Sequence, residues 1–228
     1  MLSAAELEAL ALSAKIAAVA VAGSLPAAIV IALALARTNF PGKALLDGLV
    51  HLPLVLPPVV IGYLLLISFG TKAPFGAWLL DTFGIRFVFS WTGAALAAAV
   101  LTFPFQVRAI RLALEAIDPG LSAAAQTLGA GWFDRFWHVT MPLALPGIIA
   151  GAITAFAGAL GEFGAIITFV SNVPGETRTL PLAIYTALQT PGGEAAAARL
   201  AALSIGLALV GLVLAEVAAT RVRRMIGA

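Results

Sequence analysis

The sequence predicts an all-α polytopic membrane protein, and two observations carry this prediction. Hydrophobic residues make up 61% of the 228 residues and charged residues only 11%, with a mean hydropathy of +1.05. A soluble domain of this size carries about a quarter charged residues. The chain also holds five apolar segments that are long enough to cross a bilayer, which takes roughly 20 apolar residues per helix.

The five predicted spans form a single transmembrane domain over residues 1–228. They cover residues 16–36, 49–69, 91–107, 143–170 and 200–219. The first is expected to be a retained helix, since no basic segment or clear cleavage site marks it as a signal peptide. The fourth is longer than one crossing requires, so we expect it to tilt or to break near its glycines. Residues 180–188 are too short to cross, and the sequence leaves open whether they are re-entrant or interfacial.

Basic residues near the span ends predict the orientation. Eight fall on one side of the membrane, namely Arg37, Lys43, Arg108, Arg111, Arg135, Arg221, Arg223 and Arg224. Five fall on the other side, namely Lys15, Lys72, Arg86, Arg178 and Arg199. Because basic residues are enriched on the cytoplasmic side, residues 118–142 and the C-terminus are expected in the cytoplasm. With five spans, the N-terminus is then outside.

Prolines interrupt three of the predicted spans. Pro26 and Pro104 each remove a helix hydrogen bond, and Pro53, Pro57 and Pro58 crowd one end of the second span. We expect that end to be irregular. The sequence leaves open whether the resulting kinks only shape the packing or act as hinges of a gate.

Residues 118–142 form a semi-polar island between long apolar runs. Asp118 is suited to cap a helix, Pro119 to occupy its first position, and Gly129 to end it in the left-handed conformation. The residues between them are mostly small and uncharged. We therefore predict a short, smooth helix that suits a groove on a partner protein.

The spacing within this island resembles the cytoplasmic loop of the inner-membrane permease subunits of ABC importers. That loop reads E-A-A, three residues, G, nine residues, I, one residue, L-P, and the corresponding residues here are Ala123, Ala124, Ala125, Gly129, Val139, Met141 and Pro142. Ala123 departs from the family's glutamate. Over nearly its whole length the chain resembles the molybdate permeases within that family, through FPGKALLD, HLPLVLPPVVIGYLLL, RAIRLALE, GEFGAIITFVSNVPGETRT and QTPGGE.

The resemblance implies a type I ABC importer permease fold and the partners of such a permease. These are a second copy of the chain, two cytoplasmic ATPase subunits, and a periplasmic molybdate-binding protein that delivers the oxyanion to a bacterial inner membrane. The implied ATPase-coupling residues are Asp118, Leu121, Ala123, Ala124, Ala125, Leu128, Gly129 and Pro142. Since the sequence lacks a phosphate-cradling glycine loop with its lysine, ATP and Mg²⁺ are expected on the ATPase chain. The subunit would conduct and couple by alternating access without being an enzyme.

Two sets of small residues mark the fourth predicted span. The first, at four-residue spacing, is typical of a helix-packing seam and comprises Gly147, Gly151, Ala155 and Ala159. The second surrounds an acidic residue and comprises Gly158, Gly161 and Gly164.

That acidic residue, Glu162, is the main candidate for a gate. An ionisable group in an apolar span is costly unless it is paired or faces water. A carboxylate repels an oxyanion, so Glu162 is expected either to accept hydrogen bonds from backbone amides or to pair with a cation such as Arg178. Either arrangement would hold an outer gate, while a direct role in the pathway stays open.

Further pathway or gate candidates lie around Glu162. They are Gly161, Phe163, Gly164, Thr154, Thr168 and Arg178, with Ser171 and Asn172 as additional weak donors. Weak neutral donors suit a conduit that must release its ion. The alternative is that these hydroxyls bond to carbonyls of their own helix. Arg178 would attract the anion, contact the binding protein, or be a solvated charge.

Three other functions compete with molybdate import. A sulfate, thiosulfate or tungstate permease is the nearest alternative, because these anions are also tetrahedral. An intramembrane hydrolase lacks a matched nucleophile and base, and a membrane scaffold would not need the docking helix. His51 and His138 lack a metal-ligand spacing and are interpreted as interfacial residues. The net charge of +2 is too small to indicate nucleic acid.

Overall fold

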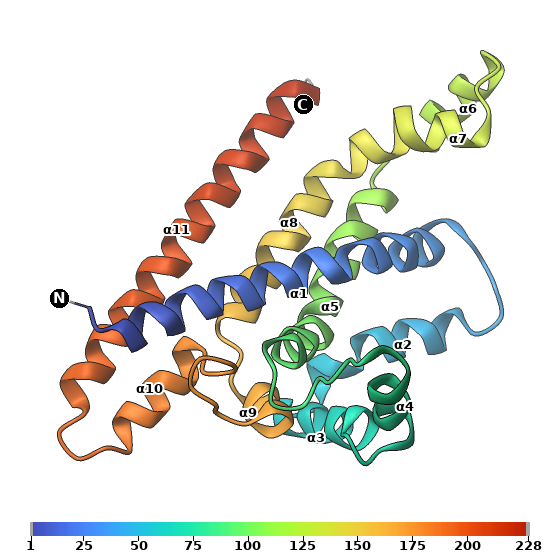
Figure 1. Cartoon of the computed structure of the whole chain (residues 1–228). Helices are drawn as coiled ribbons and strands as arrows, with labels where there is room; N and C mark the ends of the chain where they lie inside the picture. The colour runs from blue at the N-terminus through green and yellow to red at the C-terminus, as the bar shows by residue number, and fades with distance from the viewer. Residues whose placement is uncertain (1, 227–228) are drawn as a thin grey trace.

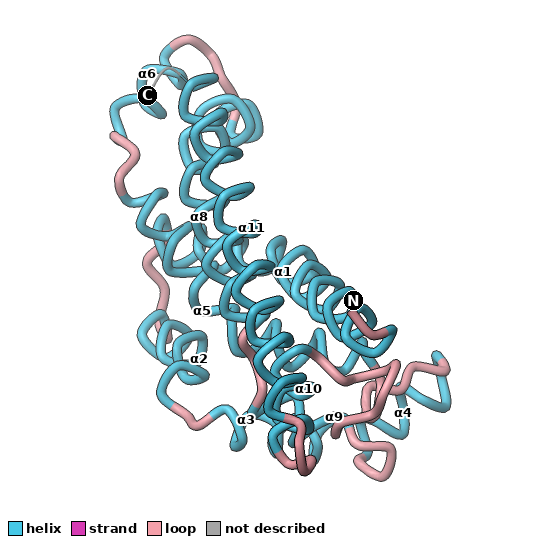
Figure 2. The backbone as a smooth tube through the Cα atoms, turned by 90° about the vertical axis from the view of Figure 1, so that its left-hand side faces the viewer, coloured by secondary structure: helices cyan, strands magenta, loops and turns pink. Residues whose placement is uncertain are grey.

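The computed structural model describes residues 2–226, except for the side chains at positions 215, 218, 219 and 222–226. Arg223 and Arg224, which support the predicted orientation, therefore have side chains outside the described residues. Within residues 2–226 the chain is helical with connecting loops and contains no strand (Figures 1 and 2). The expected all-α fold is confirmed.

Eleven α-helices and one π-helix occupy the described residues. The first half contains α1 (Ala4–Arg37), α2 (Lys43–Val55), α3 (Pro58–Phe69), α4 (Pro74–Phe83) and α5 (Trp91–Glu115). The second half contains α6 (Pro119–Thr127), α7 (Trp132–Arg135), the π-helix Phe136–Thr140, α8 (Met141–Leu160), α9 (Gly164–Val170), α10 (Leu180–Leu188) and α11 (Glu194–Ile226).

Four stretches of helix in the described chain are long and apolar enough to cross a membrane. They are Ala4–Arg37, Trp91–Glu115, Trp132–Leu160 and Glu194–Leu214. A fifth crossing results if α2 and α3 together count as one span, although they are bent by 114° relative to each other. The count therefore agrees with about five spans, but the second is not one straight helix.

The bend between α2 and α3 has a local cause in two consecutive prolines. Leu56, which caps α2, is extended at φ −78° and ψ 142°. A residue before proline avoids the helical conformation, and Pro57 itself lacks an amide hydrogen for the next turn. The irregularity predicted for this end of the second span is confirmed as a complete helix break.

The fourth predicted span also divides, at the glycines around Glu162. α8 ends at Leu160, and α9 begins at Gly164 after a short turn. Residues 143–170 are therefore a long helix followed by a short one, as expected for a segment longer than one crossing. The turn carries Gly161, Glu162 and Phe163, so the main candidate residues lie at a helix break.

α5 is the central helix, packed on one side by α1 and on another by α8. Four alanines of its first half are buried, at positions 94, 95, 97 and 98, and let α1 approach closely. The buried Gln106 donates to the Val21 carbonyl oxygen at 3.3 Å and accepts from Ser24 at 3.1 Å. These bonds satisfy the amide group, which has no water available inside a helix bundle.

Small residues form the contact between α8 and α5. A methyl group added at Gly147 would lie 2.9 Å from the Ala109 carbonyl oxygen, and one at Gly151 would lie 3.1 Å from the Gln106 Cα. Ala155 and Ala159 are buried. The packing seam predicted from their four-residue spacing is confirmed.

The molecule has two distinct ends. In both views α6 lies at one end with the terminus of α11, whereas α3, α9 and α10 lie at the opposite end (Figures 1 and 2). We call these the loop end and the far end. α10 covers residues 180–188 as the apolar run predicts, and it packs on α11 and α1.

Candidate functional site

The main element of the loop end is α6. Three residues set its boundaries. The Asp118 carboxylate accepts from the Gly120 amide at 2.8 Å, and Pro119 occupies the first turn. Gly129 has φ +89°, a conformation that costs glycine little. The amides of Gly129 and Ala130 donate to the carbonyls of Gln126 and Ala125, which completes a glycine-based helix stop. The predicted helix and both of its ends are confirmed.

The surface of α6 is bare. None of its residues is buried, and Ala124 is exposed on it. Leu128, directly after the helix, is 89% exposed, and Trp132 of α7 is 71% exposed. Both are large apolar side chains at the ends of the segment that follows α6. The Arg135 guanidinium donates to the Gln126 side-chain oxygen at 2.7 Å and holds α7 against α6.

At the far end, the carboxylate of Glu162, the residue before the N-cap Phe163, caps the N-terminus of α9. Its Oε1 accepts from the Ala165 amide at 2.7 Å, and the residue is partly buried. Of the two arrangements that the sequence left open, the structure contains the bond to backbone amide. Pairing with Arg178 is absent from the described contacts, and the Arg178 Nε donates to the Asn172 side-chain oxygen at 2.9 Å.

The loop after α9 is held by buried polar contacts. Ser171 has φ +64°, which is unusual for a residue other than glycine. The fully buried Thr177 donates to the Ser171 carbonyl oxygen at 2.9 Å and accepts from the Val173 amide at 2.8 Å. Asn172 donates to Thr186 of α10 at 2.8 Å. The loop and α10 therefore form one hydrogen-bonded unit that includes Arg178.

The other pathway candidates fall into two groups. Two of them line an apolar cavity, and two form hydrogen bonds within their own helices. Gly161 and Phe163 line a cavity of about 570 Å³ together with residues of α10 and α11. Thr154 donates to the Ala150 carbonyl oxygen at 2.9 Å, and Thr168 donates to that of Gly164 at 2.7 Å. Both hydroxyl hydrogens are therefore used inside their own helices, which was the alternative to a pathway role.

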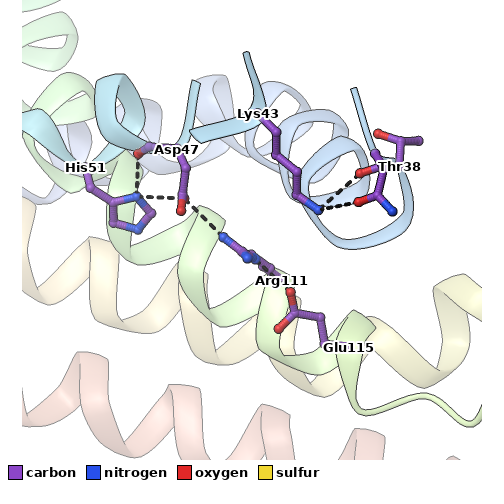
Figure 3. A network of polar contacts seen from close by, with 7 residues as sticks. Thr38, Lys43, Asp47, His51, Arg111 and Glu115 are labelled. Atoms are coloured by element: carbon purple, nitrogen blue, oxygen red, sulfur yellow. Dashed lines mark hydrogen bonds and ion pairs between the residues drawn. The ribbon is translucent and has the colours of Figure 1, made fainter. Parts of the chain in front are cut away.

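A charged cluster near the loop end was missed by the sequence analysis. The Arg111 guanidinium lies 3.1 Å from the Asp47 carboxylate and 2.8 Å from that of Glu115 (Figure 3). His51, interpreted from sequence as an interfacial residue, lies 3.2 Å from the same Asp47 oxygen. The four-residue spacings within α2 and α5 were visible in the sequence. The crossing of the two helices, which makes them one cluster, was not.

Comparison with known proteins decides the family. Residues 24–224 match the family described as the inner membrane component of binding-protein-dependent transport systems. The chain belongs to this family. It is thus a multi-pass membrane component of a transport system, and the resemblance to ABC importer permeases is confirmed.

Several relatives are named for the substrate that they transport. The molybdenum transport system permease protein ModB of Escherichia coli K12 is 60% identical over 211 residues, which are 92% of each chain. The ModB protein of Haemophilus influenzae is 53% identical over 97% of each chain. The chloroplastic sulfate permease 2 of Chlamydomonas reinhardtii is 40% identical over 86% of this chain and 53% of its own length.

Solved structures support the fold. A bacterial ABC transporter that imports alginate superposes with a TM-score of 0.73 and 21% identity, over 98% of this chain and 80% of its own. An amino acid ABC transporter superposes with a TM-score of 0.67 and 19% identity, over 95% and 94%. The fold of this chain is therefore that of ABC importer permeases.

Proposed function

We propose that the chain is the membrane-spanning permease subunit of an ATP-driven molybdate importer. The observation that carries this proposal is the 60% identity, over 92% of both chains, to a permease named for molybdenum transport. The bare α6 at the loop end supports it independently, since a permease without its own nucleotide site needs a surface on which an ATPase acts. ATP and Mg²⁺ would be held by that partner.

The proposed assembly is a homodimer with two ATPase subunits at the loop end and a binding protein at the far end. The loop end would face the cytoplasm, and the N-terminus would lie outside. The small residues Ala123, Ala124 and Ala125 of α6 would fit a cleft of the ATPase. Closure of the ATPases on ATP would move α6 and open the permease outward, and hydrolysis would reset it. The oxyanion would enter from a periplasmic molybdate-binding protein.

At the far end we assign Glu162 a gating role rather than a ligand role. Its carboxylate is used by the backbone of α9, and a carboxylate disfavours an approaching dianion. The cavity beside Gly161 and Phe163 is lined mainly by apolar residues, so it is unsuited to hold an oxyanion. Arg178, oriented by Asn172, is the better candidate to attract the anion, because guanidinium matches oxyanion geometry.

A sulfate permease is the second candidate, since the chain is also 40% identical to a protein named for sulfate. Both anions are tetrahedral dianions, so one permease architecture suits either of them. The lower identity and the smaller coverage of that relative favour molybdate.

The test is uptake of labelled molybdate by cells that carry or lack this gene beside intact partner genes, with excess tungstate or sulfate as competitor. We expect gene-dependent uptake that tungstate blocks and sulfate does not. Uptake blocked by sulfate would transfer the assignment to the sulfate permeases. Absence of any gene-dependent uptake of either anion would remove the transport assignment.

A further inference from the structure

We infer that Asp47 and Arg111 are positioning residues, which make α2 move together with the end of α5 that leads into α6. This inference rests on the proposed transport function and adds a route between the docking helix and the gate. The route consists of contacts between described residues of α5, α2, α3 and α9.

The first step is the ion pair between α2 and α5. Arg111 lies in the last turns of α5, with its Nη1 3.1 Å from Asp47 and its Nε 2.8 Å from Glu115 (Figure 3). The side chains of Arg111 and Asp47 are 27% and 38% exposed, so water screens the pair only in part. Of the two carboxylates, only Asp47 joins one helix to another. Glu115 pairs within α5.

The second step is the direct connection between this part of α5 and the docking helix. α5 ends at Glu115, and α6 begins at Pro119. The last turn of α5 is also tied to α1, because Arg37 donates to the Leu114 carbonyl oxygen at 3.1 Å. A displacement of α6 by an ATPase would therefore act on a segment of α5 that is fastened to α2.

The third step leads from α2 to the far end. The break at Leu56 turns the chain by 114° into α3, which packs against α9. A methyl group at Gly62 of α3 would lie 2.7 Å from the Ala165 carbonyl oxygen, and one at Gly164 would lie 3.0 Å from Pro58. The two helices thus touch at their backbones, directly beside the cap made by Glu162.

The same cluster could be considered as an anion site, because Arg108, Arg111 and His51 line a cavity of about 350 Å³. The charges argue against that use. Asp47 and Glu115 line the same cavity, and their two carboxylates already surround Arg111. A dianion would have to displace or approach these carboxylates. The link between helices is the use that the geometry supports.

The experiment neutralises, one at a time, the two carboxylates that contact Arg111. Each variant is measured in the complete complex of permease, ATPase and binding protein, reconstituted in lipid vesicles. Asp47→Asn removes the link between α2 and α5, whereas the matched control Glu115→Gln removes only the pair within α5. The readout is molybdate transported per ATP hydrolysed. We expect Asp47→Asn to lower this ratio by at least about fivefold, the lower range of measured couplings. Glu115→Gln should leave the ratio unchanged, and Asp47→Glu should restore it.

A second variant separates a link from a merely structural role. The chain has no cysteine, so Asp47→Cys with Arg111→Cys provides a single reactive pair for a short bifunctional crosslinker. The uncrosslinked double variant should hydrolyse ATP with little transport, and crosslinking should recover the transport. Recovery would support the inference even if Asp47→Asn assembles poorly.

Three outcomes would overturn the inference. One is an unchanged ratio in Asp47→Asn, and another is an equal loss in Asp47→Asn and Glu115→Gln, which would assign the effect to charge on Arg111. The third is a crosslinked pair that stays inactive, since α2 and α5 would then have to separate during the cycle. The wild-type complex is measured in parallel, and failure of the wild type to transport molybdate would instead remove the proposed function.

Discussion

The two ends of the molecule differ in how much of their surface the chain itself buries. At the loop end, α6 buries none of its residues and leaves Leu128 almost fully exposed. At the far end, the short α9 buries Phe169 and Val170, and the buried Thr177 has both of its bonds within the chain. The far end is therefore stabilised by its own contacts, whereas α6 at the loop end leaves most of its surface exposed.

Because of this difference, we expect substitutions at the two ends to affect different properties, namely the stability of the permease and its binding to a partner. A change at the far end removes contacts that the permease needs for its own stability. A change at α6 should disturb the bundle less and should mainly alter what binds to the permease. The comparison can be tested by three variants, ordered by the expected loss of the permease's own stability.

The largest loss is expected for Glu162→Ala at the far end. This variant leaves the Ala165 amide without its carboxylate acceptor, and a hydrogen bond to a charged group contributes about 1.5–3 kcal/mol. Glu162→Gln keeps an oxygen at the same place and should lose less. The measurements are thermal unfolding of the purified permease and molybdate uptake by the complex, which should both fall in the order glutamate, glutamine, alanine.

The control for this series is Glu176→Gln, since Glu176 is an exposed glutamate on the neighbouring loop. Neither stability nor uptake should change in the control, because exposed substitutions usually stay within about 0.5 kcal/mol. Wild-type uptake by an intact Glu162→Gln complex would contradict the gating role of the carboxylate.

An intermediate loss is expected for Gly129→Val at the loop end. Gly129 has φ +89°, where a residue with a side chain pays roughly 1–2 kcal/mol. Since α6 packs on little else, the strain should unwind its last turn without unfolding the bundle. Uptake should fall, and limited proteolysis should cut near residue 129 faster than in the wild type.

Gly131→Val is the matched control, because Gly131 has φ −67° and open space around it. It introduces the same side chain two residues away without the strain, so uptake and proteolysis should resemble the wild type. Normal coupled uptake by Gly129→Val would count against α6 as the docking element.

How much the sequence predicted also differs between the two ends. The boundaries of α6 follow from Asp118, Pro119 and Gly129, because caps and stops act over a few neighbouring residues. At the far end, the sequence located the break and the unusual glutamate. It could not choose between Arg178 and a backbone amide as the partner of Glu162, because the turn at 161–163 decides which group lies within reach.

Contacts between distant segments were the hardest to predict. The pairing of Asp47 with Arg111 requires that α2 cross α5 in one particular register, which brings together residues 64 positions apart in the sequence. For Thr154 and Thr168 the sequence left two uses open, donation to a passing ion or to a carbonyl of the same helix. The structure contains the bond within the helix for both.

The smallest loss of stability is expected for Ala124→Trp, and its consequence for assembly should be the largest. Ala124 is exposed on α6, so the indole meets nothing within the permease, and thermal unfolding of the permease alone should shift by less than about 0.5 kcal/mol. In a cleft of the ATPase, the same indole would overfill the contact. We expect the ATPase subunits to be lost during affinity purification of the Ala124→Trp complex and retained with Ala124→Ser. Full retention with Ala124→Trp would mean that this face of α6 does not enter the ATPase, and the bare surface of the loop end would then need another partner.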